Sequence, residues 1–191
     1  MVRLARHLRK HGFATEQFGY VTFTQDYKRI ARRLRSRMED LACRAPYAVV
    51  CHSLGGVLTR EALRSVEFPL PRHVIMLGTP NTRSRMAEWA MRYTPWGLFV
   101  GQAGRKLADP LFFASLPLPP VPYTVIAGTK GFRLAPVPFH GEANDTLVSV
   151  SETRLDVGER HVVLPVGHTF MMNQPSVREA IVEALKSATP E

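Results

Sequence analysis

The sequence has few cysteines, no long hydrophobic run and no internal repeat. Its two cysteines, Cys43 and Cys51, are too few for a scaffold held together by disulfides. No uninterrupted apolar stretch approaches the roughly 18 residues that a membrane-spanning helix needs. The N-terminal residues are basic and lack the apolar core of a secretory signal. We therefore expect a globular protein of the cytoplasm, with both cysteines reduced.

What the sequence does contain is enough apolar residues for a core. Of its 191 residues, 45% are hydrophobic and 21% are charged, and the 15 prolines and 13 glycines are scattered along the chain. This composition excludes a disordered or low-complexity protein. A chain of this length corresponds to one domain of about 100–200 residues. We expect a single domain over residues 1–191.

Positive charge is concentrated near the N-terminus. The chain carries 25 Lys and Arg against 16 Asp and Glu, and residues 1–44 hold 11 and 4 of these, a net charge of +7 out of +9. Such a cluster could attract the phosphates of nucleic acid or of anionic lipid. We favour the alternative, that the arginines lie on the solvated faces of two helices, because no nucleic-acid motif accompanies them. We expect no nucleic-acid partner and no cofactor, while peripheral contact with lipid stays open.

The hydrophobic pattern alternates between helix and strand. Helices are expected over residues 2–11, from Thr24 along a stripe that ends at Leu41, over about 54–66 and over 175–187. Strands are expected over residues 13–18, 47–51, 73–77, 123–127 and 161–164. This alternation predicts an α/β fold with a mainly parallel sheet of about five strands, flanked by helices.

The clearest chemical signal is the run Cys51-His52-Ser53-Leu54-Gly55-Gly56, which joins an expected buried strand to an expected helix. In that context a G-x-S-x-G-like turn is a nucleophile elbow, here with Cys51 in the first glycine position. The tight turn strains the backbone of Ser53 and lifts its Oγ clear of the sheet. The backbone N–H of Leu54 would then point to where an oxyanion forms. The alternative is an ordinary turn with a capping serine.

A serine nucleophile needs a base, and the base needs a carboxylate to orient it. In α/β-hydrolases these residues follow the serine in the order acid, then histidine. Among the downstream histidines, His140 comes too early and His161 begins an apolar strand. His168 follows the end of that strand, and we expect it to be the base. His52 is expected to pack and hydrogen-bond rather than to act as a second base.

Several carboxyl groups compete for the role of the acid. Asp145 lies in a loop after a buried strand, and we expect it to be the catalytic carboxylate. Glu142, three residues earlier, is the nearest alternative; Asp156 follows in a polar stretch, and Asp109 comes too early. The histidines show no metal-ligand spacing such as H-x-x-x-H near carboxylates, so we expect no metal site.

Three further segments resemble motifs of a known family. They are Leu77-Gly78-Thr79-Pro80-Asn81, Asn144-Asp145-Thr146-Leu147-Val148 and Gly167-His168-Thr169. Together with the serine turn, they give the sequence a resemblance to α/β-hydrolases of the bacterial lipase and esterase kind, over about residues 1–188. Thr146 stands where the family has glycine. The resemblance implies a serine esterase with a catalytic triad of Ser53, Asp145 and His168, acting on a small-molecule or lipid ester.

Two alternatives to an ester hydrolase stay open at this point. The same triad could pass the acyl group to an alcohol, which would make the protein an acyltransferase. A weakly catalytic remnant could instead act as a binding module.

The resemblance also implies a cap or lid in an insertion at about residues 81–120. This stretch holds many large apolar residues, which either line an acyl pocket or complete the core. They are Trp89, Met91, Trp96, Leu98, Phe99, Val100, Leu111, Phe112 and Phe113.

In the family a strand that ends in a His-Gly loop precedes the helix that here starts at Met1. That loop supplies a second oxyanion N–H group. We therefore expect the chain to lack an N-terminal strand that would lie between segment 13–18 and the strand at 47–51. As it stands, the chain is expected to be poorly active and prone to aggregate.

Overall fold

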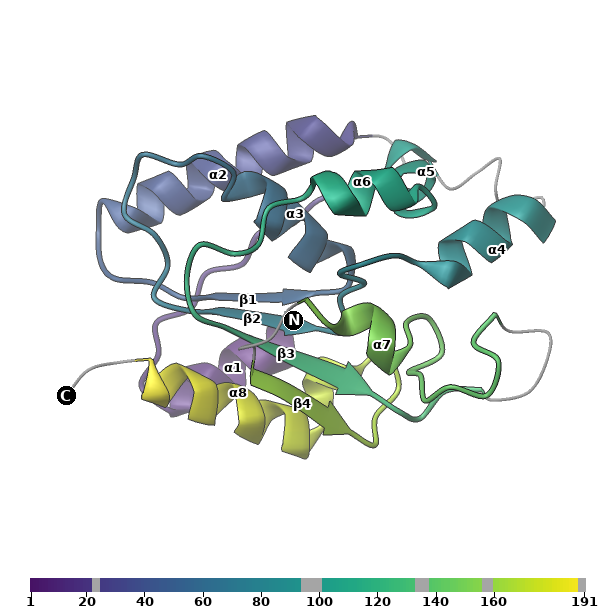
Figure 1. The fold of residues 1–191 in the computed structure, drawn as a ribbon. Coiled ribbons are helices and arrows are strands. Elements are labelled where there is room, and N and C mark those ends of the chain that lie inside the picture. Colours follow the sequence, from purple (N-terminus) through teal and green to yellow (C-terminus); the bar gives the residue numbers. More distant parts are fainter. Residues whose placement is uncertain (22–24, 94–100, 133–137, 156–159, 189–191) are drawn as a thin grey trace.

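The centre of the protein is a parallel sheet of four strands in the order β1-β2-β3-β4 (Figure 1). The strands are β1 (Val49–His52), β2 (Val74–Leu77), β3 (Tyr123–Gly128) and β4 (Arg160–Leu164). The computed structural model describes residues 1–21, 25–93, 101–132, 138–155 and 160–188. The described fold confirms the expected α/β class with a parallel sheet.

Helices cover both faces of the sheet (Figure 1). On one face lie α1 (Val2–Lys10) and α8 (Pro175–Ser187), and on the other lie α2 (Tyr27–Ala42), α3 (Leu54–Ala62) and α6 (Pro110–Ser115). The remaining short helices are α4 (Arg85–Tyr93), α5 (Gly101–Leu107), α7 (Val150–Thr153) and the 3₁₀ helix η2 (Met171–Asn173). Among the described residues, no helix is both long enough and apolar enough to cross a membrane.

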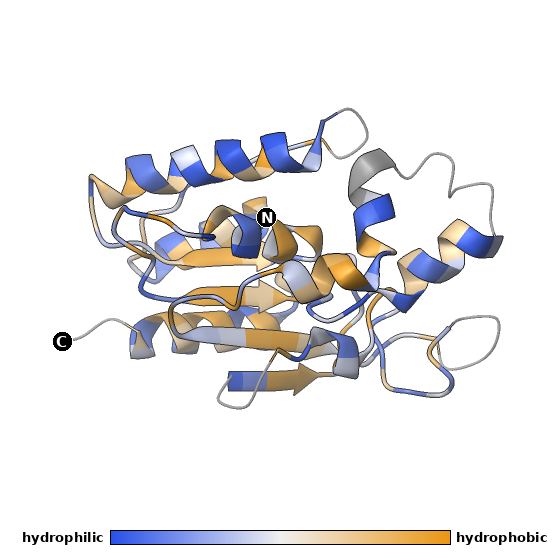
Figure 2. Ribbon diagram, turned by 45° about the horizontal axis from the view of Figure 1, so that its top comes forward, coloured by the Kyte–Doolittle hydropathy of each residue, from blue (hydrophilic) through white to orange (hydrophobic). Residues whose placement is uncertain are grey.

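The core lies between the sheet and these two helical layers. All four side chains of β2 are fully buried, as expected for an interior strand with a helix layer on each side. Figure 2 shows the apolar strands enclosed by helices whose outer faces are hydrophilic, most clearly along α2. The basic residues of α2 therefore lie mainly on its solvent side, while Ile30 and Met38 face the core.

Two expectations about the N-terminal part are wrong. Segment 13–18 forms no strand, so the sheet has four strands rather than about five. A segment becomes a strand only where a neighbouring strand pairs with its backbone groups, and segment 13–18 has no such neighbour in the described structure. Helix α2 begins at Tyr27, after an Asp26 side chain that accepts a hydrogen bond from Arg29 N (3.0 Å). Thr24, the expected cap, lies outside the described residues.

The stretch between residues 80 and 120, where an insertion is expected, contains helices α4, α5 and α6. Phe113 is buried, and the ring of Phe112 meets that of Tyr27 edge-on at 5.2 Å, so both complete the core against α2. Leu111 is 78% exposed. The Trp89 ring lies 6.1 Å from that of Tyr93. Of the other candidates, Met91 is exposed, and Trp96, Leu98, Phe99 and Val100 lie outside the described residues.

A buried arginine ties both ends of this stretch to α3. The guanidinium of Arg60 donates to the backbone oxygens of Asn81 (2.7 Å), Leu116 (3.0 Å) and Pro117 (2.9 Å). Burial lowers the pKa of Arg60 to about 10, which still leaves it charged at neutral pH. Three carbonyl acceptors compensate a buried cation for the water that it loses.

Helix α3 packs closely against Thr79, which follows β2. At Gly56, one of the two glycines of α3, there is no room for a side chain. A Cβ atom on Gly56 would lie 2.2 Å from Thr79 Oγ1, and Thr79 is fully buried with its hydroxyl bonded to Ser53 O. A Cβ atom on Gly55 would meet Cys51 Cβ at 3.4 Å, an ordinary contact. Gly56 therefore sets the distance between α3 and the end of β2.

We predict that Gly56→Ala lowers the free energy of unfolding by about 1–3 kcal/mol, because the added methyl group overpacks the contact with Thr79. Gly55→Ala is the matched control, with stability unchanged or raised by up to about 1 kcal/mol through its better helix propensity. Urea denaturation of both variants provides the measurement. Equal stabilities would contradict the packing argument.

Candidate active site

Ser53 occupies the turn between β1 and α3 in a strained backbone conformation. Its φ is +53° and its ψ is −125°, in a region that residues other than glycine rarely adopt. Ser53 N donates to Leu77 O (2.9 Å), and Thr79 Oγ1 donates to Ser53 O (3.1 Å). Both backbone groups of Ser53 are thus fixed by the end of β2. The Ser53 side chain makes no cap bond to α3 and so stays available for other contacts.

The two arms of this turn are separated by an ordinary contact distance. An added Cβ atom on Gly55 would lie 3.4 Å from Cys51 Cβ, so the turn accommodates Cys51 in the first glycine position. Cys51 is buried, and burial raises the pKa of its thiol to about 12. Its sulfur lies 3.4 Å from Ile75 O. The thiol is therefore protonated and serves in packing.

Asp145 and His168 form a buried pair. Asp145 Oδ2 lies 2.7 Å from His168 Nδ1, and the side chains are 0% and 5% exposed. The two residues are also joined through the backbone, where His168 N donates to Asp145 O (2.8 Å). These contacts fix both the position and the orientation of the imidazole ring.

The two carboxylate oxygens of Asp145 bind different partners. Oδ1 accepts from the backbone N–H groups of Leu147 (3.0 Å) and Val148 (2.8 Å), which leaves Oδ2 for His168. An ionised carboxylate can only accept, so Nδ1 of His168 carries the hydrogen. Nε2 of the neutral ring then has a free lone pair with which it can take a proton.

The end of β2 brings this pair next to the serine turn. A Cβ atom on Gly78 would lie 2.9 Å from Asp145 Oδ2 and 3.1 Å from His168 Nδ1, and Gly78 has a φ of +53°. Gly78 directly follows Leu77, whose carbonyl holds the backbone of Ser53. The hydrogen bonds formed by the described residues do not include one between Ser53 Oγ and His168 Nε2.

His52, the last residue of β1, links this strand to the loop that carries His168. Its Nε2 donates to His168 O (3.0 Å), and the two rings are 4.7 Å apart. Burial lowers the pKa of His52 to about 4, and the nearby His168 acts in the same direction. His52 is therefore neutral at pH 7 and stabilises the loop through a hydrogen bond.

The carboxylates considered as alternatives to Asp145 bind other partners. Glu142 Oε2 accepts from Arg85 (2.5 Å) and its Oε1 accepts from Ser151 N (3.0 Å), so this carboxylate faces α4 and not His168. Burial raises the pKa of Glu142, but the hydrogen bonds from Ser151 and Arg85 outweigh it and lower the pKa overall. Asp109 caps α6 by accepting from Leu111 N (2.9 Å), and Asp156 lies outside the described residues.

The alternative histidines are also separate from the pair. His161 Nε2 lies 2.8 Å from Thr153 Oγ1, and His140 is exposed in a turn with a φ of +48°. In the described part of the chain, no group of three or more His, Cys, Asp or Glu residues is arranged to hold a metal ion.

Sequence reasoning missed the buried network that holds the acid loop. Glu152 is 1% exposed, and its carboxylate accepts from Arg85 N (2.6 Å) and Ser149 N (2.8 Å). The pattern Ser149-x-x-Glu152 is a capping box, so a local signal existed in the sequence. The role of Arg85, which joins α4 to Glu142, Ser149 and Glu152, has no such signal.

Thr146 adopts a backbone conformation that explains the glycine usual at this position. Its φ is +103°, which is unfavourable for a β-branched residue. The turn is held by Asn144 Oδ1, which accepts from Thr146 N (3.0 Å). The loop thus keeps its shape around Asp145 although the glycine is absent.

Comparison with known proteins reveals similarity at the level of structure. No family model and no curated protein matches the sequence. The mature form of the lipase BlEst2 from Bacillus licheniformis has a TM-score of 0.70 and 19% identity, over 98% of this chain and 84% of the lipase. Phospholipase PlaB from Legionella pneumophila has a TM-score of 0.71 and 19% identity, over 96% of this chain, which spans 55% of that protein.

A thermophilic esterase from Thermogutta terrifontis is also similar, with a TM-score of 0.57 and 18% identity, over 99% of this chain and 85% of the esterase. At identities below 25% these similarities establish architecture rather than activity. The protein has the fold of the α/β-hydrolase superfamily.

Proposed function

We propose that the protein is a serine hydrolase that cleaves carboxylic esters, with Ser53 as nucleophile, His168 as base and Asp145 as the orienting acid. The observation that carries this proposal is the buried Asp145–His168 pair, joined at 2.7 Å, beside a serine in a strained turn. The similarity of the fold to lipases and esterases supports the same reaction class.

In the proposed reaction, Nε2 of His168 takes the hydroxyl proton of Ser53 while Oγ attacks the ester carbonyl carbon. Asp145 stabilises the imidazolium that forms. The tetrahedral intermediate then collapses, the alcohol leaves with the proton from His168, and an acyl-enzyme remains. Water activated by His168 releases the acid and restores the serine.

The N-terminus of α3 supplies electrostatic stabilisation in this scheme. Leu54 occupies the first position of the helix, so its N–H group has no partner within α3. This N–H group and the positive end of the helix dipole favour an oxyanion next to Ser53.

Apolar side chains next to the acid and the base favour an apolar acyl group as substrate. Phe170 and Leu147 are 67% and 41% exposed, and they lie two residues after His168 and Asp145, respectively. We assign the stretch 81–120 to a cap over the edge of the sheet where Ser53, Asp145 and His168 lie. This cap belongs to the same single domain. Arg60 anchors that stretch at both ends.

We predict that Ser53→Ala lowers hydrolysis of p-nitrophenyl butyrate by about 10⁴-fold or more, because the nucleophile is lost. A fluorophosphonate probe is expected to label the natural chain and not the variant. Ser36→Ala, at an exposed position of α2, is the matched control and should keep both activity and labelling. Turnover by Ser53→Ala equal to that of the natural chain would refute the assignment.

We predict that Asp145→Asn lowers kcat by about 10⁴-fold, because the amide no longer fixes the tautomer of His168. Glu142→Gln should keep kcat, since its carboxylate is bonded to Arg85 and Ser151. Because the pKa of Glu142 is lowered on folding, its stabilisation exists above the ordinary glutamate pKa and is lost as the pH falls. Glu142→Gln should therefore have a lower melting temperature than the natural chain. The difference should be larger at pH 7 than at pH 3. The opposite kinetic result would mean that Glu142 is the acid.

A further inference from the structure

Asp145 lies at the tip of a short hairpin formed by residues 142–152, which we call the acid hairpin. An antiparallel bridge joins Asn144 on its first arm to Ser149 on its second, and Asp145 N donates to Val148 O (3.0 Å). Val148 N in turn donates to Asp145 Oδ1 (2.8 Å). The position of the second arm therefore helps to decide which carboxylate oxygen remains for the base.

The turn at the tip of the acid hairpin is unfavourable for the residue that it contains. Thr146 directly follows Asp145 and has a φ of +103°, a conformation that β-branched residues rarely adopt. Such a conformation persists only where the surrounding structure holds it. Within the hairpin, Asn144 Oδ1 accepts from Thr146 N (3.0 Å). A contact from outside that holds both arms would further stabilise the position of Asp145.

Arg85, the first residue of α4, makes such a contact. Its Nη2 atom donates to Glu142 Oε2 on the first arm and to Ser149 Oγ on the second, each at 2.5 Å. Its Nε atom lies 3.3 Å from Glu152 Oε1, and its backbone N–H group donates to the same oxygen (2.6 Å). One planar guanidinium group thus holds the two arms together. We call these contacts the Arg85 clamp.

The Arg85 clamp is largely shielded from water. The side chain of Arg85 is 19% exposed and that of Glu152 is 1% exposed. The guanidinium carbon of Arg85 lies 5.5 Å from the ring centroid of Phe139, which is itself buried. Hydrogen bonds between ionised groups are stronger than neutral ones, and they gain strength where water is excluded. The clamp can therefore fix the position of the acid hairpin.

The path from the clamp to the Asp145 carboxylate is short. Ser149, which accepts from Arg85, directly follows Val148, whose N–H group donates to Asp145 Oδ1. A shift of the second arm would move this donor and turn the carboxylate relative to His168. Asp145 Oδ2 lies 2.7 Å from His168 Nδ1, so a small rotation is enough to lengthen that bond.

We propose that Arg85 is a positioning residue for Asp145, because it holds the acid hairpin in a shape that Thr146 by itself disfavours. The inference rests on the proposed function, in which Asp145 orients the base. The geometry of the Asp145–His168 pair can nevertheless be measured without substrate. A role limited to neutralising the buried charge of Glu152 would affect stability and leave that geometry unchanged.

The test compares Arg85→Ala with Arg83→Ala, a matched control whose guanidinium pairs with Glu88 and not with the acid hairpin (2.6 Å). Arg85→Ala should lower kcat by about 10–100-fold at nearly unchanged KM, because small displacements near the reacting atoms have effects of this size. We express kcat per serine titrated with the fluorophosphonate probe, so that unfolded molecules are not counted. In proton NMR of the substrate-free protein, the His168 Nδ1 proton should move upfield as its bond to Asp145 lengthens.

A conservative variant separates positioning from charge. Arg85→Ala leaves the buried carboxylate of Glu152 without this cation, which lowers stability. Arg85→Lys keeps a cation at this place but lacks the planar fork that reaches both arms. It should regain most of the stability, while kcat stays about tenfold below that of the natural chain. Full recovery of kcat in Arg85→Lys would overturn the proposal, because charge alone would then suffice.

A second substitution tests whether Arg85 acts through the turn. Thr146→Gly removes the unfavourable conformation, since glycine adopts a positive φ readily. In this background the loss of kcat caused by Arg85→Ala should be smaller by about fivefold or more, a coupling typical of residues in one network. An equal loss in both backgrounds would contradict the proposal.

The NMR measurement keeps this inference separate from the proposed function. If Arg85→Ala and Arg83→Ala both retain the natural His168 signal, Arg85 is not a positioning residue. Absence of Ser53-dependent turnover in the natural chain would instead refute the proposed esterase. An upfield shift of the His168 proton in Arg85→Ala alone would still support the clamp in that case.

Discussion

Parallel strands end at the same edge of a sheet, and every part of the candidate site depends on this alignment. Ser53 follows β1, Gly78 follows β2, and His168 lies four residues after the end of β4. His52 pairs with Leu77 and Leu77 with Ile126 in the strand register, so these ends are level. The buried interior strands fix the register, because a shift by one residue would turn their apolar side chains away from the core.

The site combines unfavourable backbone conformations with many fixed hydrogen bonds. Ser53, Gly78 and Thr146 all have positive φ values. For a residue other than glycine, such a conformation costs about 1–3 kcal/mol, so the surrounding structure has to stabilise it. At Ser53 the carbonyl of Leu77 and the hydroxyl of Thr79 do this. Both contacts involve backbone atoms of Ser53, and its side chain makes no cap bond to α3.

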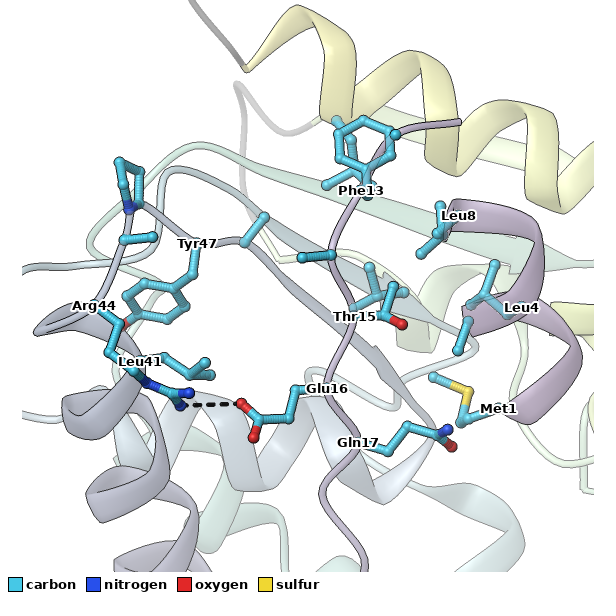
Figure 3. A pocket seen from close by; sticks show the side chains of 18 residues that line it. Met1, Leu4, Leu8, Phe13, Thr15, Glu16, Gln17, Leu41, Arg44 and Tyr47 are labelled. Carbon is cyan, nitrogen blue, oxygen red and sulfur yellow. Dashed lines mark hydrogen bonds and ion pairs between the residues drawn. The ribbon is translucent and has the colours of Figure 1, made fainter. Parts of the chain in front are cut away.

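The two sides of strand β1 have different surroundings. On one side β1 is joined to β2 along its whole length, while on the other Ala48 and Val50 line a cavity of about 660 Å³ (Figure 3). The turn that contains Ser53 is held from the β2 side, by Leu77 O and Thr79 Oγ1. The stability of the fold and the rigidity of the serine turn are therefore linked through the same strand.

The sequence by itself determined the elements whose signals are local. Apolar periodicity predicted α1 and α8, continuous apolar runs predicted the four strands, and the motif around Ser53 predicted its turn. The tertiary structure decided what depends on neighbours. Segment 13–18 has a strand-like sequence but no strand beside it to accept its hydrogen bonds. Asp145 and Glu142 are equally acidic and three residues apart; only the path of the folded loop turns one toward His168 at 2.7 Å and the other toward Arg85 at 2.5 Å.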